Sequence, residues 1–234
     1  MSTPTQLKAL IFDVDGTMYR QGRVRRAMVW RLLRAHVTQP HRGLLTLRVL
    51  HAYRRAQEVM RALPKEDGDL AERQLLLASK WTGVSREVVR SCVGRWMEQE
   101  PLEIVARSRR EGLLEFLSAA IERGLRLGVF SDYPPDAKLA AMGIAHLFDV
   151  TTSAQDPDVQ QFKPSSRGLE VTIHRLGVGN HEALYVGDRP EIDALAASGA
   201  AVACAIMGRP GVVGRRGWFA VSDYRELKDA IFCQ

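Results

Sequence analysis

The sequence predicts an α/β fold, in which helices cover both faces of a parallel sheet and a helical domain is inserted into the chain. Three observations predict it. A buried strand lies near the N-terminus, a long block with helical periodicity follows, and from residue 108 short apolar strands alternate with helices. Such alternation is typical of a parallel sheet with crossover helices. We therefore assign residues 1–18 and 108–234 to the core and residues 19–107 to the insertion.

Composition indicates an ordinary globular protein. The chain has 234 residues, of which 46% are hydrophobic, enough for a sizeable core. Its three cysteines are far apart and have no metal-ligand spacing, so we interpret them as free thiols in a reducing compartment. Neither a leader peptide nor an apolar stretch of transmembrane length is apparent. We expect a cytoplasmic protein.

The insertion is predicted to be helical throughout. Apolar residues recur at helical spacing over residues 24–60, with a break at Gln39-Pro40 that separates two helices. Two more helices are predicted over residues 70–80 and 85–97. Three tryptophans of this block are expected to pack inside it: Trp30, Trp81 and Trp96.

The core is predicted to alternate strands and helices. Its strands are short apolar runs, expected at residues 7–14, 125–130, 148–152, 183–186 and 201–207. Its helices have helical apolar spacing and often end at a glycine, and are expected at residues 109–123, 134–142, 164–176 and 191–197, with a last one ending at Phe232.

Positive charge is concentrated in the first part of the insertion. The net charge of the whole chain is +6, but the segment from Arg20 to Arg61 holds eleven arginines and one acid, Glu58. This segment could attract a nucleic acid, an anionic membrane or a highly phosphorylated substrate. The alternative is a solvated helix face that keeps the protein soluble. Oligomeric state is not predicted.

Two carboxylates at the end of the first strand make the strongest candidate site. The stretch Asp13-Val14-Asp15-Gly16-Thr17 follows an apolar run, and the alternation of a strand lets Asp13 and Asp15 point the same way. Two carboxylates this close repel unless a cation binds or one of them keeps a proton, so the spacing favours a divalent metal. The glycine lets the backbone turn, and free N–H groups in such a turn can bind phosphate.

Three later features fall at predicted strand ends or loops. Ser131 offers a hydroxyl, Lys163 an ammonium before a helix, and Asp188 a further carboxylate, with Asp193 close behind it. In open α/β sheets, ligands bind at the carboxyl ends of the strands. Together these groups are what phosphoryl transfer needs: a nucleophile, an acid/base, a cation and donors around the phosphate oxygens.

In this order the motifs resemble those of the haloacid dehalogenase-like superfamily of phosphohydrolases. Asp13 to Thr17 matches the first motif, Ser131 the second, Lys163 the third, and Gly187-Asp188 with Asp193 the fourth. The place of the insertion, between the first and second motifs, resembles the subfamily with a helical cap domain, which includes phosphoglycolate phosphatase and beta-phosphoglucomutase. The resemblance implies a Rossmann-like core and a Mg²⁺-dependent phosphatase for a small phosphorylated metabolite.

The resemblance also implies roles for the residues. Asp13 would attack phosphorus and form an aspartyl-phosphate, and Asp15 would protonate the leaving oxygen and later activate water. Mg²⁺ would be held by the Asp13 carboxylate, the Asp15 backbone carbonyl and Asp188, with Asp193 supporting them from behind. Residues that hold the phosphate would be Ser131 and Lys163, with the turn at Gly16 and Thr17.

Alternatives stay open at this point. Carbon–halogen hydrolysis needs no acid two residues after the nucleophile, so Asp15 argues for phosphate. A phosphomutase would use the same aspartyl-phosphate, and a third hypothesis makes the basic helices an anchor for a membrane or polyanion. Asp132 stands where the family often has asparagine. Its charge requires that it point away from the phosphate or pair with a cation such as Arg189, or it caps the turn.

Overall fold

The computed structural model describes residues 7–63, 68–208 and 217–233, and its centre is a six-stranded sheet in the order β3-β2-β1-β4-β5-β6. Every adjacent pair is parallel. The strands are β1 (Ala9–Phe12), β2 (Arg126–Ser131), β3 (Val150–Ser153), β4 (Ala183–Gly187), β5 (Ala203–Met207) and β6 (Trp218–Val221). The predicted α/β fold with a parallel sheet is confirmed.

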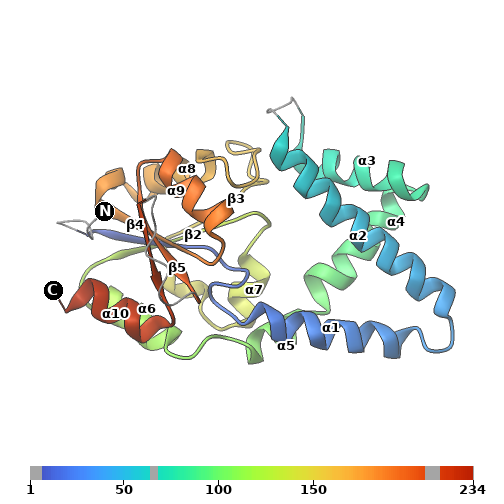
Figure 1. Ribbon diagram of the computed structural model, residues 1–234, viewed down its shortest axis with the longest axis horizontal. Coiled ribbons are helices and arrows are strands. Elements are labelled where there is room, and N and C mark those ends of the chain that lie inside the picture. The colour runs from blue at the N-terminus through green and yellow to red at the C-terminus, as the bar shows by residue number, and fades with distance from the viewer. Residues whose placement is uncertain (1–6, 64–67, 209–216, 234) are drawn as a thin grey trace.

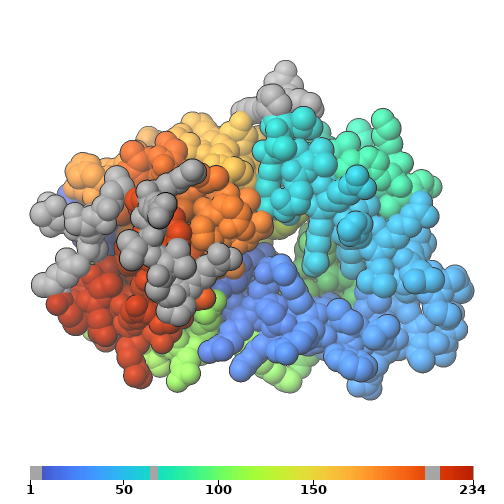
Figure 2. All heavy atoms as spheres, viewed as in Figure 1, coloured from blue at the N-terminus to red at the C-terminus, as the bar shows by residue number. Residues whose placement is uncertain are grey.

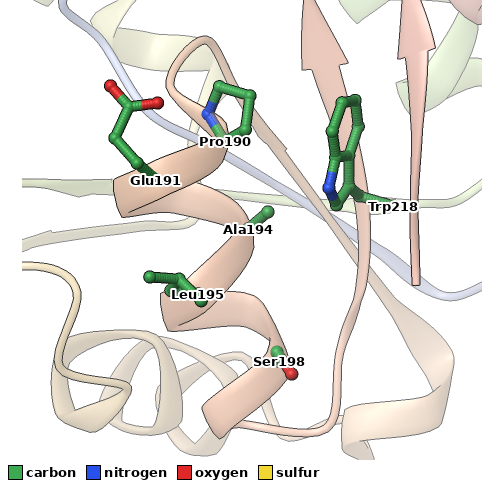
Figure 3. Close-up of a pocket in the computed structure, with 6 residues that line it drawn as sticks. All are labelled: Pro190, Glu191, Ala194, Leu195, Ser198 and Trp218. Atoms are coloured by element: carbon green, nitrogen blue, oxygen red, sulfur yellow. The ribbon is translucent and has the colours of Figure 1, made fainter. Parts of the chain in front are cut away.

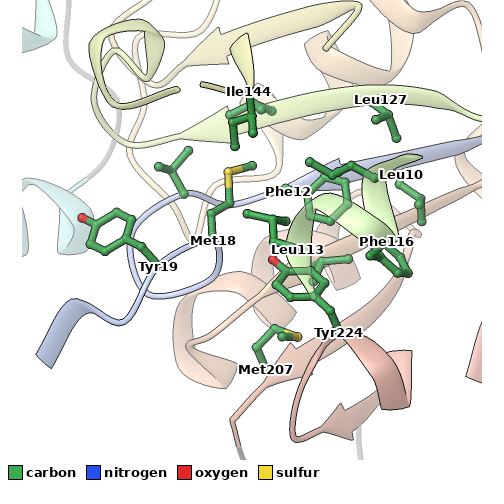
Figure 4. Packing of buried hydrophobic residues seen from close by; sticks show 14 of the residues in the cluster. Leu10, Phe12, Met18, Tyr19, Leu113, Phe116, Leu127, Ile144, Met207 and Tyr224 are labelled. Carbon is green, nitrogen blue, oxygen red and sulfur yellow. The ribbon is translucent and has the colours of Figure 1, made fainter. Parts of the chain in front are cut away.

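Helices cover both faces of this sheet, as Figure 1 shows. The side chains of β1 alternate: Leu10 and Phe12 face one layer, and Ala9 and Ile11 face the other. The first layer contains α6 (Leu113–Glu122), α7 (Asp136–Ala141) and α10 (Tyr224–Phe232). Figure 4 shows Leu113 and Phe116 of α6 and Tyr224 of α10 near Phe12. The second layer contains α8 (Arg167–Leu176) and α9 (Leu195–Gly199). Because β1 is central and apolar on both faces, it is fully buried.

The described chain between β1 and α6 is mostly helical, as predicted. Its helices are α1 (Gln21–Ala35), α2 (Pro40–Ala62), α3 (Leu70–Thr82), α4 (Arg86–Val93), a π-helical turn (Gly94–Gln99) and α5 (Leu102–Arg107). We call these the inserted helices. Three of them, α2, α3 and α4, share an apolar cluster of their own that includes Val49, Leu75 and Val89. Tyr19 and Arg109 form an isolated β-bridge, so the two connections to the core run side by side.

Among the inserted helices, α1 packs against the core, as α5 does through Val105. It diverges from α2 after the turn that joins them, and its Val24 packs into the core cluster beneath the sheet (Figure 1). The expected burial of the tryptophans is right only for Trp96, since Trp30 is 68% exposed and Trp81 is 38% exposed. In the described part of the chain, no helix is both long and apolar enough to cross a membrane.

Candidate active site

The candidate site lies at the carboxyl ends of β1, β2 and β4. Asp13 directly follows β1, Ser131 is the last residue of β2, and Asp188 directly follows β4. The Asp13 N–H donates to the Val186 carbonyl oxygen over 2.9 Å, which keeps the end of β1 beside β4. The chain winds from β1 outward in both directions, so this edge is the switch point at which α/β sheets bind ligands.

Lys163 connects two buried carboxylates at this point. Its Nζ lies 2.6 Å from Asp13 Oδ1 and 2.7 Å from Asp193 Oδ1, and it also donates to the Tyr185 hydroxyl over 3.1 Å. The three charged residues are almost completely buried. The structure thus brings together three groups that the sequence separates by up to 180 positions, from Asp13 to Asp193.

Asp188 adds a third carboxylate to this group. Asp13, Asp188 and Asp193 each offer an oxygen, and these atoms lie within 4.8 Å of one another. With the single ammonium of Lys163, the group has a net charge of −2 when all are ionised. Burial, together with the charge of Asp193, raises the pKa of Asp188 to about 6, and burial raises that of Asp13 well above its usual range. Hard oxygen donors in a group with uncompensated negative charge fit a divalent cation such as Mg²⁺.

Asp193 is held from several sides. Its Oδ1 accepts from Lys163 and from the Tyr185 hydroxyl, at 3.0 Å, and its Oδ2 accepts from the backbone N–H groups of Asp188 and Arg189. Burial opposes its ionisation, but Lys163 and these bonds outweigh it and lower the pKa of Asp193. With both oxygens engaged, Asp193 is suited to fix Lys163 and the Asp188 loop.

The turn after Asp13 requires its glycine. Gly16 has a φ of +100°, and a Cβ there would lie 2.1 Å from Asp188 Oδ2. The backbone can therefore approach the Asp188 carboxylate only because no side chain intervenes. Thr17 donates its hydroxyl to Asp13 Oδ2 over 3.2 Å, and the Thr17 carbonyl accepts from the Tyr224 hydroxyl.

Asp15 lies outside the group of three carboxylates. Its carboxylate accepts from Lys138 Nζ, at 2.6 and 2.8 Å, and from the Tyr19 hydroxyl. Burial raises the pKa of Asp15, but the Lys138 ammonium and these hydrogen bonds outweigh it and lower the pKa below its usual value. A ligand role for Asp15 through its backbone carbonyl stays a prediction. Sequence analysis did not single out Lys138 or Tyr19.

Asp132, the residue after Ser131, is bound by the inserted helices. Its Oδ2 accepts from Gln57 Nε2 over 3.0 Å and forms an ion pair with Arg61, and its Oδ1 accepts from the Lys163 N–H over 3.0 Å. The cation that compensates Asp132 is therefore Arg61 of α2, whereas Arg189, suggested by the sequence, pairs with Glu191. Asp132 connects the inserted helices to the loop that carries Lys163.

Replacing Asp132 with asparagine is expected to lower the free energy of unfolding by about 3 kcal/mol. Both oxygens of Asp132 accept hydrogen bonds. In asparagine one of these acceptors becomes an NH₂ donor, which would face either the Lys163 N–H or the donors of Gln57 and Arg61. Urea denaturation would measure the change. The control is Glu58→Gln, which removes the exposed second partner of Arg61 and should cost less than about 1 kcal/mol. Equal effects of the two variants would contradict this account of Asp132.

A cleft of about 1270 Å³ opens above these residues. Asp13, Asp15, Ser131, Lys163 and Asp188 line it from the core. Apolar and basic side chains line it from the inserted helices, among them Met28, Leu32, Arg25, Arg54 and Arg61. The Ser131 hydroxyl accepts one long bond, 3.4 Å from the Tyr133 N–H, so it can donate into the cleft. A smaller pocket between α9 and Trp218 of β6, drawn in Figure 3, contains none of the predicted site residues.

Similarity to known proteins shows the family of this chain. The family model of the haloacid dehalogenase-like hydrolases matches residues 7–201, and the chain therefore belongs to this family. The prediction of a hydrolytic enzyme is confirmed.

Individual relatives are similar over most of their length. A glyceraldehyde 3-phosphate phosphatase of Methanopyrus kandleri is 28% identical over 193 residues, which are 80% of this chain and 78% of the relative. A subfamily IA hydrolase from Geobacter sulfurreducens superposes with a TM-score of 0.61 at 24% identity, over 96% of this chain and all of the other. CbbY from Rhodobacter sphaeroides, solved with phosphate, gives 0.62 at 18%, over 95% and 96% of the two chains. These structures share the fold of this protein.

Proposed function

We propose that the protein is a Mg²⁺-dependent phosphatase that hydrolyses a small phosphorylated metabolite through an aspartyl-phosphate on Asp13. The observation that carries the proposal is the group formed by the buried Asp13, Lys163 and Asp193 with the partly exposed Asp188, in the lining of an open cleft. Membership in a hydrolase family supports it, as does similarity to a curated phosphatase.

The residues would act as follows. A carboxylate oxygen of Asp13 attacks phosphorus while the bond to the leaving oxygen breaks, and Asp15 gives that oxygen a proton. Because Lys138 lowers the pKa of Asp15, Asp15 would have to take up this proton when the substrate binds. Asp15 then takes a proton from the water that hydrolyses the aspartyl-phosphate. Bonds from Lys138 and Tyr19 fix the orientation of Asp15, two residues from the nucleophile. Lys163 and the Ser131 hydroxyl donate to the phosphate oxygens, together with N–H groups of the turn at Gly16 and Thr17.

The Mg²⁺ ion would be bound by Asp13 and Asp188 with the backbone carbonyl of Asp15. A divalent cation supplies charge that lets a phosphate dianion approach the carboxylates and that stabilises negative charge on the transferred oxygens. Asp193 holds Lys163 and the Asp188 loop in place behind these ligands.

The inserted helices would form the cap domain of this enzyme, with boundaries near residues 18 and 108. Their side chains make one wall of the cleft, so they would close over the substrate and exclude water. The proposed subfamily is the one with a helical cap between the first and second motifs, similar to phosphoglycolate phosphatase and beta-phosphoglucomutase. A sugar or triose phosphate is the first substrate class to examine, because the curated relative acts on glyceraldehyde 3-phosphate.

Removal of the metal is expected to abolish phosphate release. The test measures inorganic phosphate from a panel of phosphorylated metabolites, with Mg²⁺, after chelation, and after Mg²⁺ is restored. We expect at least one substrate to be hydrolysed, with activity falling by about a hundredfold or more on chelation and returning with Mg²⁺. Activity unchanged by chelation would contradict the proposed metal. Transfer of phosphate to a second sugar hydroxyl, without release, would favour the mutase alternative.

A further inference from the structure

One surface of the inserted helices combines exposed apolar side chains with arginines, and the proposed chemistry does not use it. We call this surface the tip face and define it by four apolar and three basic residues: Trp30, Leu33, Val37, Leu44, Arg26, Arg34 and Arg42. Its apolar side chains are exposed by 68%, 53%, 77% and 68%, in that order. Isolated exposed leucines are common, but four large exposed apolar side chains on one helical hairpin indicate an interaction surface.

The spacing along α1 places these residues on one side of the helix. Arg26, Trp30 and Arg34 follow each other at four-residue intervals, with Leu33 beside Arg34, and Val37 lies in the turn just beyond the end of α1. The buried residues of α1, Val24 and Leu32, lie on the opposite side. α1 thus has apolar residues on two sides. One side packs on the protein, and the other presents apolar and basic side chains to solvent.

Leu44 of α2 is exposed at the same end of the hairpin, where the two helices touch at their turn. A Cβ on Gly43 would lie 3.0 Å from His36 Cβ, so the first turn of α2 is packed directly against the end of α1. Leu44 and Val37 are therefore brought to the same end of the hairpin. This end lies far from the sheet in Figure 1, and Figure 2 shows it as the outermost part of the inserted helices.

The arginines of the tip face are not neutralised by the protein. Arg31, on another side of α1, pairs with Glu100 and Glu103. Over the residues that the structure describes, no ion pair involves Arg26, Arg34 or Arg42. The one acid among residues 20–61, Glu58, pairs with Arg61 near the core. The tip face therefore keeps its positive charge.

We propose that the tip face docks the protein on an anionic lipid membrane, with its apolar side chains among the acyl chains and its arginines at the headgroups. A helix that presents tryptophan and leucine between arginines has the composition of an interfacial helix. A nucleic acid would match the arginines but would leave Leu33, Val37 and Leu44 without apolar contacts. A second copy of the chain would match the apolar residues but would oppose one positively charged face to another.

Docking in this way leaves the active-site cleft open. The cleft is lined by Val24, Met28 and Leu32 of α1, whereas Trp30 and Leu33 do not line it. The same helix can therefore rest on a membrane with its outer side and line the cleft with its inner side. The inference does not depend on the proposed phosphatase activity.

Vesicle binding tests the proposal. The full chain would be mixed with phosphatidylcholine vesicles, or with vesicles in which about a third of the lipid is phosphatidylglycerol, and the bound fraction measured by flotation. We expect binding to the anionic vesicles that is at least about tenfold stronger than to the neutral ones and that weakens in high salt. Binding should be accompanied by a blue shift of tryptophan emission that Trp30→Phe abolishes.

Matched variants separate the tip face from general charge and hydrophobicity. Trp30→Ser with Leu33→Ser should reduce binding by about tenfold or more, whereas Ile121→Ser, an exposed apolar residue of α6, should not. The double variant Arg26→Gln with Arg34→Gln should also reduce vesicle binding by about tenfold or more. The double variant Arg225→Gln with Lys228→Gln on α10 removes the same amount of charge and should leave binding unchanged. Because the tip residues are exposed, these variants should fold normally, which circular dichroism would verify. Equal binding to neutral vesicles, binding only to nucleic acid, or self-association without vesicle binding would each overturn the proposal.

Discussion

Replacing Asp13 with asparagine is expected to reduce phosphate release by at least about a thousandfold, because the amide that replaces the carboxylate is not a competent nucleophile. The variant should remain folded. Asparagine has nearly the same shape, Thr17 can still donate to its oxygen, and Lys163 keeps its bond to Asp193. The NH₂ group of asparagine would lie opposite Lys163, so we expect a loss of stability of up to about 3 kcal/mol, and circular dichroism would verify that the variant is folded.

The control for this variant is Asp136→Asn in the same cleft. Asp136 lies at the start of α7, on the rim of the cleft, and makes one weak hydrogen bond, to Thr151 over 3.4 Å. Its replacement should change the rate less than about threefold. A mass increase of one phosphate on wild-type protein quenched during turnover, absent in Asp13→Asn, would identify the intermediate. Near-normal activity of Asp13→Asn would rule out Asp13 as the nucleophile.

Residues at strand ends could be predicted from the sequence because chain position determines their place in space. Asp13, Ser131 and Asp188 each follow or end an apolar run, and parallel strands bring such positions to one edge of the sheet. Lys163 could be predicted only through the order of the family's motifs, because nothing in its neighbourhood distinguishes it from a surface lysine. The structure shows that it is buried between two carboxylates.

Pairs formed across large sequence separations could not be predicted. Lys138 pairs with Asp15 although 123 positions separate them in the sequence, and Arg61 pairs with Asp132 although 71 positions separate them. Arg61 is one of eleven arginines between residues 20 and 61, and local sequence does not indicate which of them turns inward. The pairing depends on how α2 lies over the core, which is determined by packing rather than by local spacing.

The exposure of Trp30 has a similar origin. Apolar residues occupy more than one side of α1, so periodicity alone did not tell which side packs on the protein. The prediction that Trp30 packs inside the insertion was wrong, and the structure instead buries Val24 and Leu32. The arginine-rich segment was recognised from the sequence, but the apolar residues that share its outer surface became apparent only in the structure.

Replacing Lys163 with methionine is expected to destabilise the protein by about 3 to 5 kcal/mol, the largest change in stability that we predict. Burial alone would lower the pKa of Lys163, but the carboxylates of Asp13 and Asp193 outweigh burial and hold that pKa well above its usual value. Methionine fills nearly the same volume and leaves Asp13 and Asp193 buried without their shared cation. Urea denaturation at neutral pH would measure the loss.

Two further variants make this expectation specific to the buried pair. Lys138→Met removes an ammonium from Asp15 at a partly exposed position, so it should cost only about 1 kcal/mol. Adding Asp193→Asn to Lys163→Met removes one of the two orphaned charges and should restore part of the lost stability. If Lys163→Met were as stable as the wild type and the second substitution restored nothing, Asp13 and Asp193 could not both be ionised in the folded protein. The proposed metal site, which depends on the negative charge of these carboxylates, would then have to be abandoned.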